Sequence, residues 1–497
     1  AELKELKEKR DDLKKVYQQL YNESDVAEKR KLQLFKNSIQ KRTAELQRRI
    51  NEKDFAKNVR KTVELDEQAR QLVKDRNRIK HEFDVLQEKN RIANRSFNEK
   101  VKDYALEILN LPKGLLSTLD MSAPLRQGIV LAAGNPKEFG KATKEMFLQA
   151  FSGKYADEWL ANLKTSPEYD LMQDSKLYIA DTHAKLQAKE EQFMTNLAQK
   201  IPYYGALVRG SERAYTGFLN KLRVDVFAKG VDMLNGQGFN PNDNPEMYKQ
   251  WAEFINNATG RGNLGSLEKS AEFLNNAFFS PRMLASRLAI MNPAEYASMS
   301  PEVRKMAMKN TLSFVGFGLM VLALAGLGGA ETEENPLSTD FGKIKVGNTR
   351  YDIWGGFLPI IRTIAQVTLG MKKDSRTGEI KELGGNYNRG TILENFFRSK
   401  LSPFVGSIVN LLTGKNMIGE KVTPEKELLK SVVPLYIQDI YSLTQQDEVN
   451  PLEVASTAIP SFFGVGVQSY EDKNKGTAPK VSSVPVNSKP IVSRPIK

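Results

Sequence analysis

The sequence predicts a mainly α-helical protein. We expect long amino-terminal helices in a coiled coil or helical hairpin, then a multi-helix domain with one central, very apolar helix and a short β-hairpin. Three observations support this prediction. Charged residues fill 49 of the first 110 positions, where neither proline nor glycine occurs. Capped helical segments of ordinary length follow, and residues 311–330 form a run of twenty without one charge.

Shifts in composition divide the chain into four predicted parts. Residues 1–110 form a charged long-helix or coiled-coil region, and residues 111–300 an all-helical domain. Residues 301–470 hold the apolar helix, the short hairpin and further helices. Residues 471–497 form an extended basic tail rich in proline and serine, because it has four basic residues and no acid from Lys480 onward.

The first region carries a narrow apolar stripe whose members recur every three, four or seven residues, the spacing of a helix that pairs with another helix. Its candidate oligomer or coiled-coil positions are Leu6, Leu13, Leu20, Leu32, Phe35, Ile39, Leu46 and Ile50. The many basic residues around the stripe indicate either a solvated helical face, the preferred interpretation, or contact with DNA.

Helix signals mark the second part. Ser211 to Lys229 place Tyr215, Phe218, Leu219, Leu222 and Val226 on one face, with Ser211 as the expected cap. Further helices are expected to begin at Ser266 and at Asn292-Pro293, where Glu295 occupies the capping-box position.

The uncharged run TLSFVGFGLMVLALAGLGGA, residues 311–330, is long enough to cross a hydrocarbon core of about 30 Å. Ser300, Pro301 and Glu302 predict that its helix begins near Pro301. Two interpretations stay open: the helix enters a membrane, or it is the core of a helical domain and is covered on all sides. The candidate membrane-inserting residues are Leu312, Phe314, Val315, Phe317, Leu319, Met320, Val321, Leu322, Leu324 and Leu327.

A different unit follows the apolar run. Residues 341–346 and 349–353 alternate in polarity around Gly347-Asn348, which predicts a hairpin with a two-residue turn. Residues 354–370 are apolar but contain Arg362, so we expect a buried or interfacial helix rather than a second span. Residues 401–412 are apolar but too short to span, and Thr423-Pro424-Glu425 begins another helix.

Catalytic chemistry finds little support in the composition. The chain has no cysteine and only two histidines, His81 and His183, so thiolate chemistry is excluded and a histidine-based metal or triad site is not expected. The GRGNLG sequence at residues 260–265 follows a predicted helix instead of the strand that a dinucleotide fingerprint requires. The GKNMIGEK sequence at residues 414–421 lacks the Gly-Lys-Ser/Thr ending of a phosphate loop. We therefore predict no enzyme activity, no catalytic residue, no cofactor and no metal.

Seven phrases in order resemble the large polyvalent proteins that tailed phages and related mobile elements encode. They are LPKGLLSTLDMSAPLRQG at 111–128, EEQFMTNLAQKIP at 190–202, SERAYTGFLNKLRVDVF at 211–227, NATGRGNLGSLEKSAEFLNNAFFSPRMLASR at 257–287, YDIWGGFLPIIRTIAQ at 351–366, FFRSKLSPFVGSIVNLLTGKNMIGE at 396–420 and FFGVGVQSY at 462–470. The resemblance covers about residues 105–470. Such proteins are packaged in the virion and delivered into the host with the DNA, and this part of them carries no known chemistry.

The resemblance implies a non-enzymatic segment of a phage virion cargo or ejection protein. Its expected location is the virion, then the host cell envelope or cytoplasm after delivery. Other virion proteins of the capsid, portal or tail are the expected partners; DNA, suggested by the net charge of +13, a host membrane and a second copy of the chain are further candidates. The start of the sequence, AELKELKEKR, is that expected of an interior piece of a longer polypeptide. The alternatives are a structural virion assembly component, portal-associated or tape-measure-like, and a non-catalytic part of a nucleic-acid enzyme polyprotein.

Overall fold

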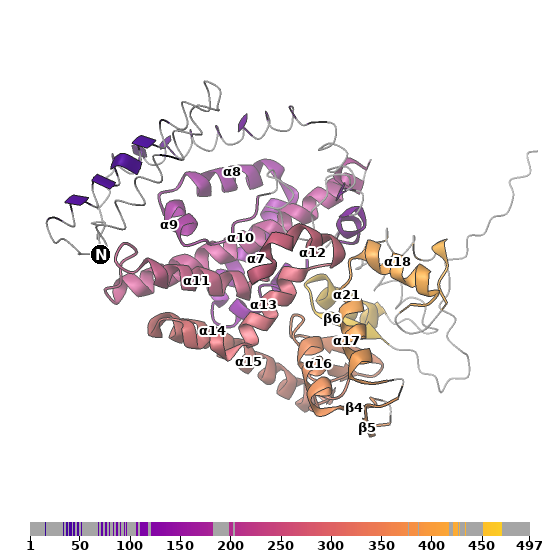
Figure 1. Ribbon diagram of the computed structural model, residues 1–497. Coiled ribbons are helices and arrows are strands. Elements are labelled where there is room, and N and C mark those ends of the chain that lie inside the picture. The colour runs from indigo at the N-terminus through magenta and orange to yellow at the C-terminus, as the bar shows by residue number, and fades with distance from the viewer. Residues whose placement is uncertain are drawn as a thin grey trace, which may run out of the picture. The chain divides into compact units, whose positions relative to one another are not determined.

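The computed structural model describes most of the chain after residue 110. The described ranges are 110–117, 121–181, 198–201, 204–375, 377–385, 387–416, 421–425 and 451–469, with scattered single and paired positions elsewhere. These residues are mainly helical with small antiparallel sheets, which confirms the predicted fold class (Figure 1). Residues 1–63 and 64–497 form two compact units.

The described positions of the first unit are helical. Gln33 donates a hydrogen bond to Asn37 (3.2 Å) and the Thr43 hydroxyl donates to the Ile39 carbonyl (2.9 Å), both over the four-residue spacing of one helical turn. Ile39, a predicted stripe position, is half-buried. The other stripe positions, Leu6, Leu13, Leu20, Leu32, Phe35, Leu46 and Ile50, lie outside the described residues, so the coiled coil stays a prediction.

The second unit is built around one long central helix, α10 (Tyr204–Gly236), which packs most extensively on α7 (Pro136–Phe151). Among the described residues before the apolar run, further helices include one over residues 110–116, α5 (Ala123–Arg126), α6 (Ile129–Ala132), α8 (Gly153–Thr165), α9 (Glu168–Asp174), η3 (Ala198–Lys200), α11 (Pro245–Ala258), η4 (Gly265–Ser270), α12 (Ala271–Ala277), α13 (Pro281–Met291) and α14 (Pro293–Ser298).

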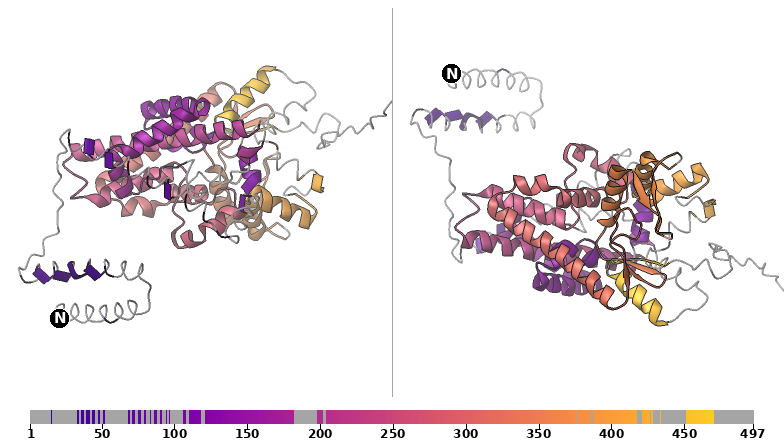
Figure 2. Two further views of the ribbon diagram at one scale, coloured as in Figure 1. Left: turned by 90° about the horizontal axis from the view of Figure 1, so that it is seen from above. Right: turned by 90° about the horizontal axis from the view of Figure 1, so that it is seen from below.

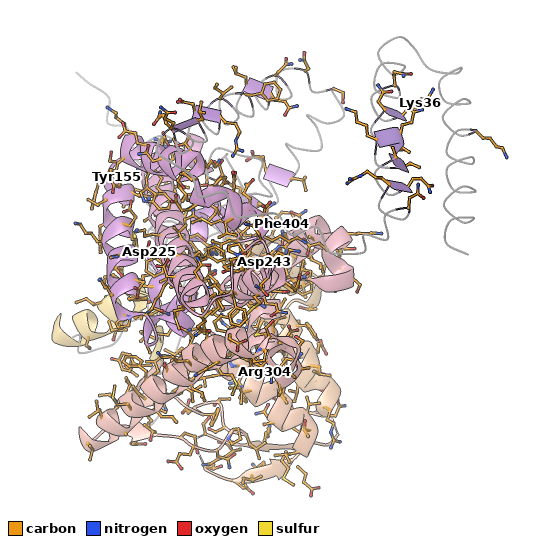
Figure 3. All side chains as sticks on the ribbon, turned by 90° about the vertical axis from the view of Figure 1, so that its left-hand side faces the viewer. Lys36, Tyr155, Asp225, Asp243, Arg304 and Phe404 are labelled. Carbon is orange, nitrogen blue, oxygen red and sulfur yellow. The ribbon has the colours of Figure 1, made fainter. Side chains whose placement is uncertain are left out.

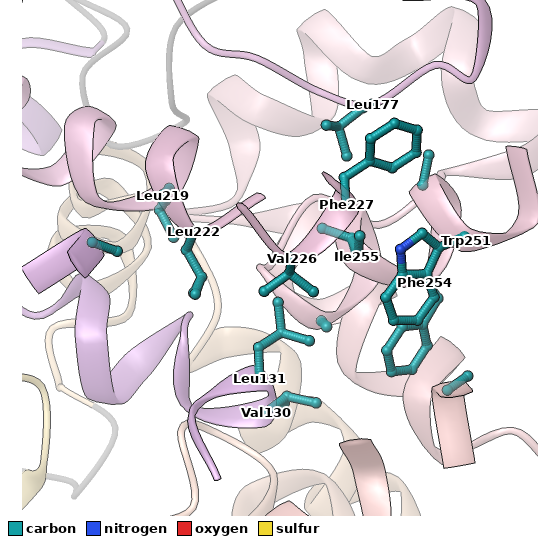
Figure 4. Packing of buried hydrophobic residues seen from close by; sticks show 14 of the residues in the cluster. Val130, Leu131, Leu177, Leu219, Leu222, Val226, Phe227, Trp251, Phe254 and Ile255 are labelled. Atoms are coloured by element: carbon teal, nitrogen blue, oxygen red, sulfur yellow. The ribbon is translucent and has the colours of Figure 1, made fainter. Parts of the chain in front are cut away.

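The core of this unit confirms the predicted apolar face of α10. Tyr215, Phe218, Leu219, Leu222 and Val226 are all fully buried. Figure 4 shows Val226 of this face beside Leu131 of α6 and Ile255 of α11, and all three belong to one hydrophobic cluster. Recurrence every three or four residues therefore identified the buried side of the helix correctly.

The predicted beginning of this helix was wrong. Ser211 does not cap a helix, because α10 begins seven residues earlier, at Tyr204. The Ser211 hydroxyl is buried inside the helix and donates to the Leu207 carbonyl (2.9 Å). Gly205, near the start of the helix, permits close packing: a Cβ atom there would lie 2.0 Å from the Gln199 carbonyl oxygen.

The other two predicted caps differ in outcome. Asn292 caps α14, since its side-chain oxygen accepts a hydrogen bond from the Ala294 N–H (3.1 Å). Ser266 does not cap a helix, because it lies within the 3₁₀ turn η4, and α12 begins only at Ala271.

The predicted hairpin is present and belongs to a larger sheet. Strands β2 (Ile344–Val346) and β3 (Thr349–Asp352) pair antiparallel with Val346 opposite Thr349, so Gly347-Asn348 form the two-residue turn. Gly347 has a φ of 55°, the positive value that such turns require. Strand β1 (Glu331–Thr332) pairs with β2, and β6 (Gly466–Ser469) pairs with β3. The sequence did not predict the pairing of residues 349–352 with residues 466–469.

Helices and a second hairpin complete the unit. These are α16 (Leu358–Leu369), β4 (Met371–Lys373), β5 (Ile380–Glu382), α17 (Arg389–Arg398), α18 (Pro403–Thr413) and α21 (Pro451–Phe462). One hydrophobic cluster joins residues on both sides of residue 300, for example Ile255 and Val303, so the core is continuous across that predicted boundary. The predicted basic tail, residues 471–497, lies outside the described residues.

Candidate membrane-contact site

The apolar run lies within α15 (Pro301–Leu327), which begins at the predicted residue. Ser300 precedes it, but its hydroxyl does not cap the helix. Instead, its N–H and Oγ both donate to the side-chain oxygen of Gln250 (2.8 and 2.9 Å). Because Gln250 belongs to α11, these two hydrogen bonds tie the first turn of α15 to the core of the unit.

One side of α15 is buried along most of its length. A stripe with helical spacing faces inward, formed by Val303, Met306, Ala307, Asn310, Phe314 and Gly318. Its neighbours include α6 and α11. The stripe continues weakly beyond Gly318, where Val321 and Ala325 on the same side are only half-buried. The helix is therefore anchored through its first five turns and loosely covered after them.

A polar pair strengthens the anchor at its middle. Asn135 donates through Nδ2 to Asn310 Oδ1 (2.6 Å), and Asn310 donates through Nδ2 to the Met306 carbonyl (2.9 Å). Lys229 Nζ donates to Asn135 Oδ1 (2.9 Å). Both asparagines are buried, so each hydrogen bond satisfies a group that would otherwise be costly to remove from water.

An aromatic clamp holds the next turn. The Phe314 ring lies edge-on to Trp354, with ring centroids 5.7 Å apart, and 5.5 Å from the Phe357 centroid. One turn later, the Trp354 ring fills the space beside Gly318. A Cβ atom on residue 318 would lie 2.5 Å from Cη2 of Trp354, so glycine permits this contact. The indole Nε1 donates to the Gly342 carbonyl (2.8 Å), which fixes the ring in place.

A buried arginine positions the loop that carries the clamp. Arg287 donates through Nε to the Gly355 carbonyl (3.0 Å) and through Nη2 to the Arg126 carbonyl (2.6 Å). Its guanidinium also lies 4.8 Å from the centre of the Phe357 ring. Burial lowers the pKa of Arg287 to about 10, which reflects the cost of holding a cation in the core.

The other side of α15 is apolar and exposed. Only 17% of its most apolar window is buried, so the interpretation in which the helix is covered on all sides does not hold. In Figure 2, seen from below, α15 is the long salmon helix that lies in front of the other described elements of its unit. Among the described residues it is the one helix long and apolar enough to cross a membrane.

The ten predicted membrane-inserting residues divide by their position around this helix. Phe314 faces the core and is 4% exposed, and Val321 and Leu322 are half-buried. The remaining seven are exposed, from 38% for Val315 to 86% for Leu327. We name these seven the outer face of α15: Leu312, Val315, Phe317, Leu319, Met320, Leu324 and Leu327.

Charged residues border both ends of the outer face. At the amino-terminal end, Lys305 and Lys309 are exposed. Beyond the carboxyl-terminal end, Glu331 pairs with Lys345 and Glu333 pairs with Lys373, each at 2.6 Å. The hydrogen bond from Lys345 lowers the pKa of Glu331. Burial acts to raise the pKa of Glu333, but the hydrogen bond from Lys373 and nearby backbone groups leave it lowered.

The glycine-rich GRGNLG sequence contributes to helix packing. The GRGNLG loop follows α11, a helix, as predicted. Gly260 has a φ of 80°, and a Cβ atom on Gly262 would lie 2.3 Å from the Ser286 nitrogen, so the loop packs directly against α13. Within the described residues, no group of three or more acidic or histidine side chains could hold a metal ion. His81, His183 and residues 417–420 lie outside them.

Two features of this site were not predicted. Trp354 anchors α15 although it lies 40 positions after Phe314 in the chain. Exposed apolar residues also end α18, where Leu412 is 83% exposed. No protein-family model, curated protein or solved structure matches this chain.

Proposed function

We propose that this chain is a non-enzymatic, membrane-binding segment of a phage virion cargo or ejection protein, which contacts the host membrane through the outer face of α15. The single observation that supports this most strongly is the exposure of seven large apolar side chains on one helix. Contiguous apolar surface of this kind in a folded protein marks an interaction site.

The energy available from the outer face is sufficient for binding. Transfer of one fully exposed leucine side chain out of water contributes roughly 1.5–3 kcal/mol. Seven side chains that are about half exposed would therefore contribute on the order of 5–10 kcal/mol, less the cost of immobilising the protein at the surface. A bilayer accepts such a face without needing a shaped partner.

The buried stripe determines how the helix would bind. Because Phe314 and Gly318 are held by Trp354, only one side of α15 is free, and the folded protein would lay this helix along the membrane surface. Crossing the bilayer would require the clamp to open, which exposes Phe314 and Trp354 together. Surface binding is therefore the first step, and insertion across the bilayer would follow only if the clamp is released.

Vesicle flotation tests the membrane function. The double variant Leu319→Gln/Leu324→Gln removes two exposed side chains of the outer face without changing charge. Its matched control, Phe151→Gln/Phe273→Gln, removes two exposed apolar side chains on α7 and α12, which are 87% and 70% exposed. We expect the wild type and the control to float with vesicles and the double variant to remain at the bottom. Equal flotation of both variants would refute the role of α15.

The virion part of the proposal rests on the resemblance of residues 105–470 to phage polyvalent proteins. It is tested by mass spectrometry of phage particles purified from the source culture by density gradient. Peptides from this chain should band with the capsid proteins and resist external protease. Peptides found only in the cell lysate, and never in the particle band, would contradict a packaged protein.

A further inference from the structure

A shallow, open groove, which we name the basic groove, lies beside the first three turns of α15, directly before the outer face. Its lining combines apolar side chains with three cations. The lining residues are Pro301, Arg304, Lys305, Met308, Lys309, Leu312 and Ser313. Figure 3 labels Arg304, which lies in this amino-terminal part of α15. Leu312 belongs both to the groove and to the outer face, so the two surfaces are continuous.

Two of these cations have no side-chain partner within the described part of the chain. The side chains of Lys305 and Lys309 form no hydrogen bond or ion pair there, and both are exposed. Arg304 donates through Nη2 to the carbonyls of Ala297 (3.1 Å) and Met299 (3.0 Å), and no described carboxylate pairs with it. Other lysines of the unit do have acidic partners, for example Lys221 with Asp225 (2.8 Å).

The spacing of the two lysines points to an anionic ligand. Lys305 and Lys309 are one helical turn apart and so lie on the same side of α15, where like charges repel. Leu312 and then Leu319 continue along that side. Cations beside an exposed apolar face match the surface of a bilayer, where anionic phospholipid headgroups adjoin hydrocarbon.

We propose that the basic groove binds phosphate headgroups of anionic phospholipids while the outer face of α15 enters the adjoining hydrocarbon, so that the chain selects negatively charged bilayers. This inference rests on the proposed membrane function and adds the lipid class to it. DNA also presents phosphates, but the apolar side chains in the lining and the continuity with seven exposed apolar side chains favour a lipid surface over a duplex.

The size of the expected preference follows from the two free lysines. One lysine close to an anionic membrane surface strengthens binding about fivefold, so two should contribute about 25-fold. The double variant Lys305→Gln/Lys309→Gln removes both. Lys137→Gln/Lys141→Gln is the matched control, because these exposed lysines have the same four-residue spacing on α7.

Partitioning of the full chain is measured on phosphatidylcholine vesicles and on vesicles that also contain phosphatidylglycerol, at fixed salt, after circular dichroism has shown equal helicity. We expect the wild type and the α7 control to prefer the anionic vesicles, the α15 lysine variant to lose about 25-fold of that preference, and all three to bind neutral vesicles equally. An unchanged preference in the α15 lysine variant would overturn the headgroup site while leaving the membrane function intact.

Three other outcomes also overturn the inference, and they are distinguishable from one another. If the wild type binds neither vesicle, the proposed membrane function fails as well. If short duplex DNA binds the wild type, and the α15 lysine variant loses DNA binding but keeps its vesicle preference, the groove serves a nucleic acid. If a second copy of the chain occupies the groove, the wild type should dimerise as its concentration rises and the α15 lysine variant should not. That result would likewise contradict a lipid site.

Discussion

The anchor of α15 on Trp354 can be tested by adding one carbon atom at either of two glycines. Gly318→Ala places a Cβ atom 2.5 Å from Cη2, 2.7 Å from Cζ3 and 3.0 Å from Cζ2 of Trp354. Gly316→Ala, two residues earlier on the same helix, meets nothing within 4 Å. Both positions lie in the helix interior, so the same substitution differs only in what it contacts.

The magnitude follows from this comparison. Carbon atoms prefer separations of about 3.5–4.0 Å, so the indole or the helix must move by about 1 Å in the Gly318→Ala variant. Trp354 cannot move cheaply, because its Nε1 and its backbone N–H both donate hydrogen bonds, to Gly342 O and to Asp352 Oδ1. Overpacking of this kind costs about 1–3 kcal/mol. Replacing glycine by alanine in a helix gains up to about 1 kcal/mol, but this gain is common to both variants.

Urea unfolding of the two variants, followed by far-ultraviolet circular dichroism and by tryptophan fluorescence, measures the difference. We expect Gly318→Ala to be less stable than Gly316→Ala by about 1–3 kcal/mol in free energy of unfolding. We also expect the summed tryptophan emission, to which Trp159, Trp251 and Trp354 contribute, to change in the former variant only. Equal stabilities with unchanged emission would refute the claim that Trp354 anchors α15, and with it the argument that the helix binds the membrane by one side.

Three further predictions concern the core that supports the site. Asn310→Ala removes the acceptor of the Asn135 side chain and should lower the free energy of unfolding by about 1–3 kcal/mol in urea titrations, whereas no loss would mean that the pair is not buried. Gly140→Ala, in the exposed interior of α7 with open space around it, should raise stability by up to about 1 kcal/mol, and a loss would contradict the packing of α7. Burial raises the pKa of Tyr248 from 10.0 to about 12, so its phenol stays protonated longer in the folded state and its contribution to stability is lost as the pH rises from about 10 towards 12. Wild type should therefore lose stability relative to Tyr248→Phe as the pH rises from about 10 towards 12, and a constant difference over that range would refute the assignment.

Local signals in the sequence predicted much of the fold. Ser300, Pro301 and Glu302 located the start of α15, and Gly347-Asn348 located the hairpin turn, because both depend on residues next to one another in the chain. Ser211 misled the prediction for α10, since a serine inside a helix and a serine that caps one are alike in sequence. In the structure the helix runs through Ser211 from Tyr204, and the Ser211 hydroxyl donates to the Leu207 carbonyl within it.

The exposed side of α15 could not be predicted. Residues 311–330 are apolar on every side, so no periodic pattern distinguishes the side that packs from the side that does not. That distinction depends on contacts distant in sequence, above all those of Phe314 with Trp354 and Phe357. The pairing of β3 with β6 is distant for the same reason, because it joins residues more than 100 positions apart.

The most direct test of the central claim uses the absence of cysteine from the chain. A single cysteine introduced as Leu319→Cys on the outer face, and another as Phe151→Cys on α7, can each be labelled with an environment-sensitive nitrobenzoxadiazole dye. We predict that added anionic vesicles shift the emission of the Leu319→Cys label to the blue and increase its intensity, while the Phe151→Cys label does not change. An unchanged spectrum at residue 319, under conditions where the protein floats with the vesicles, would contradict membrane binding through α15.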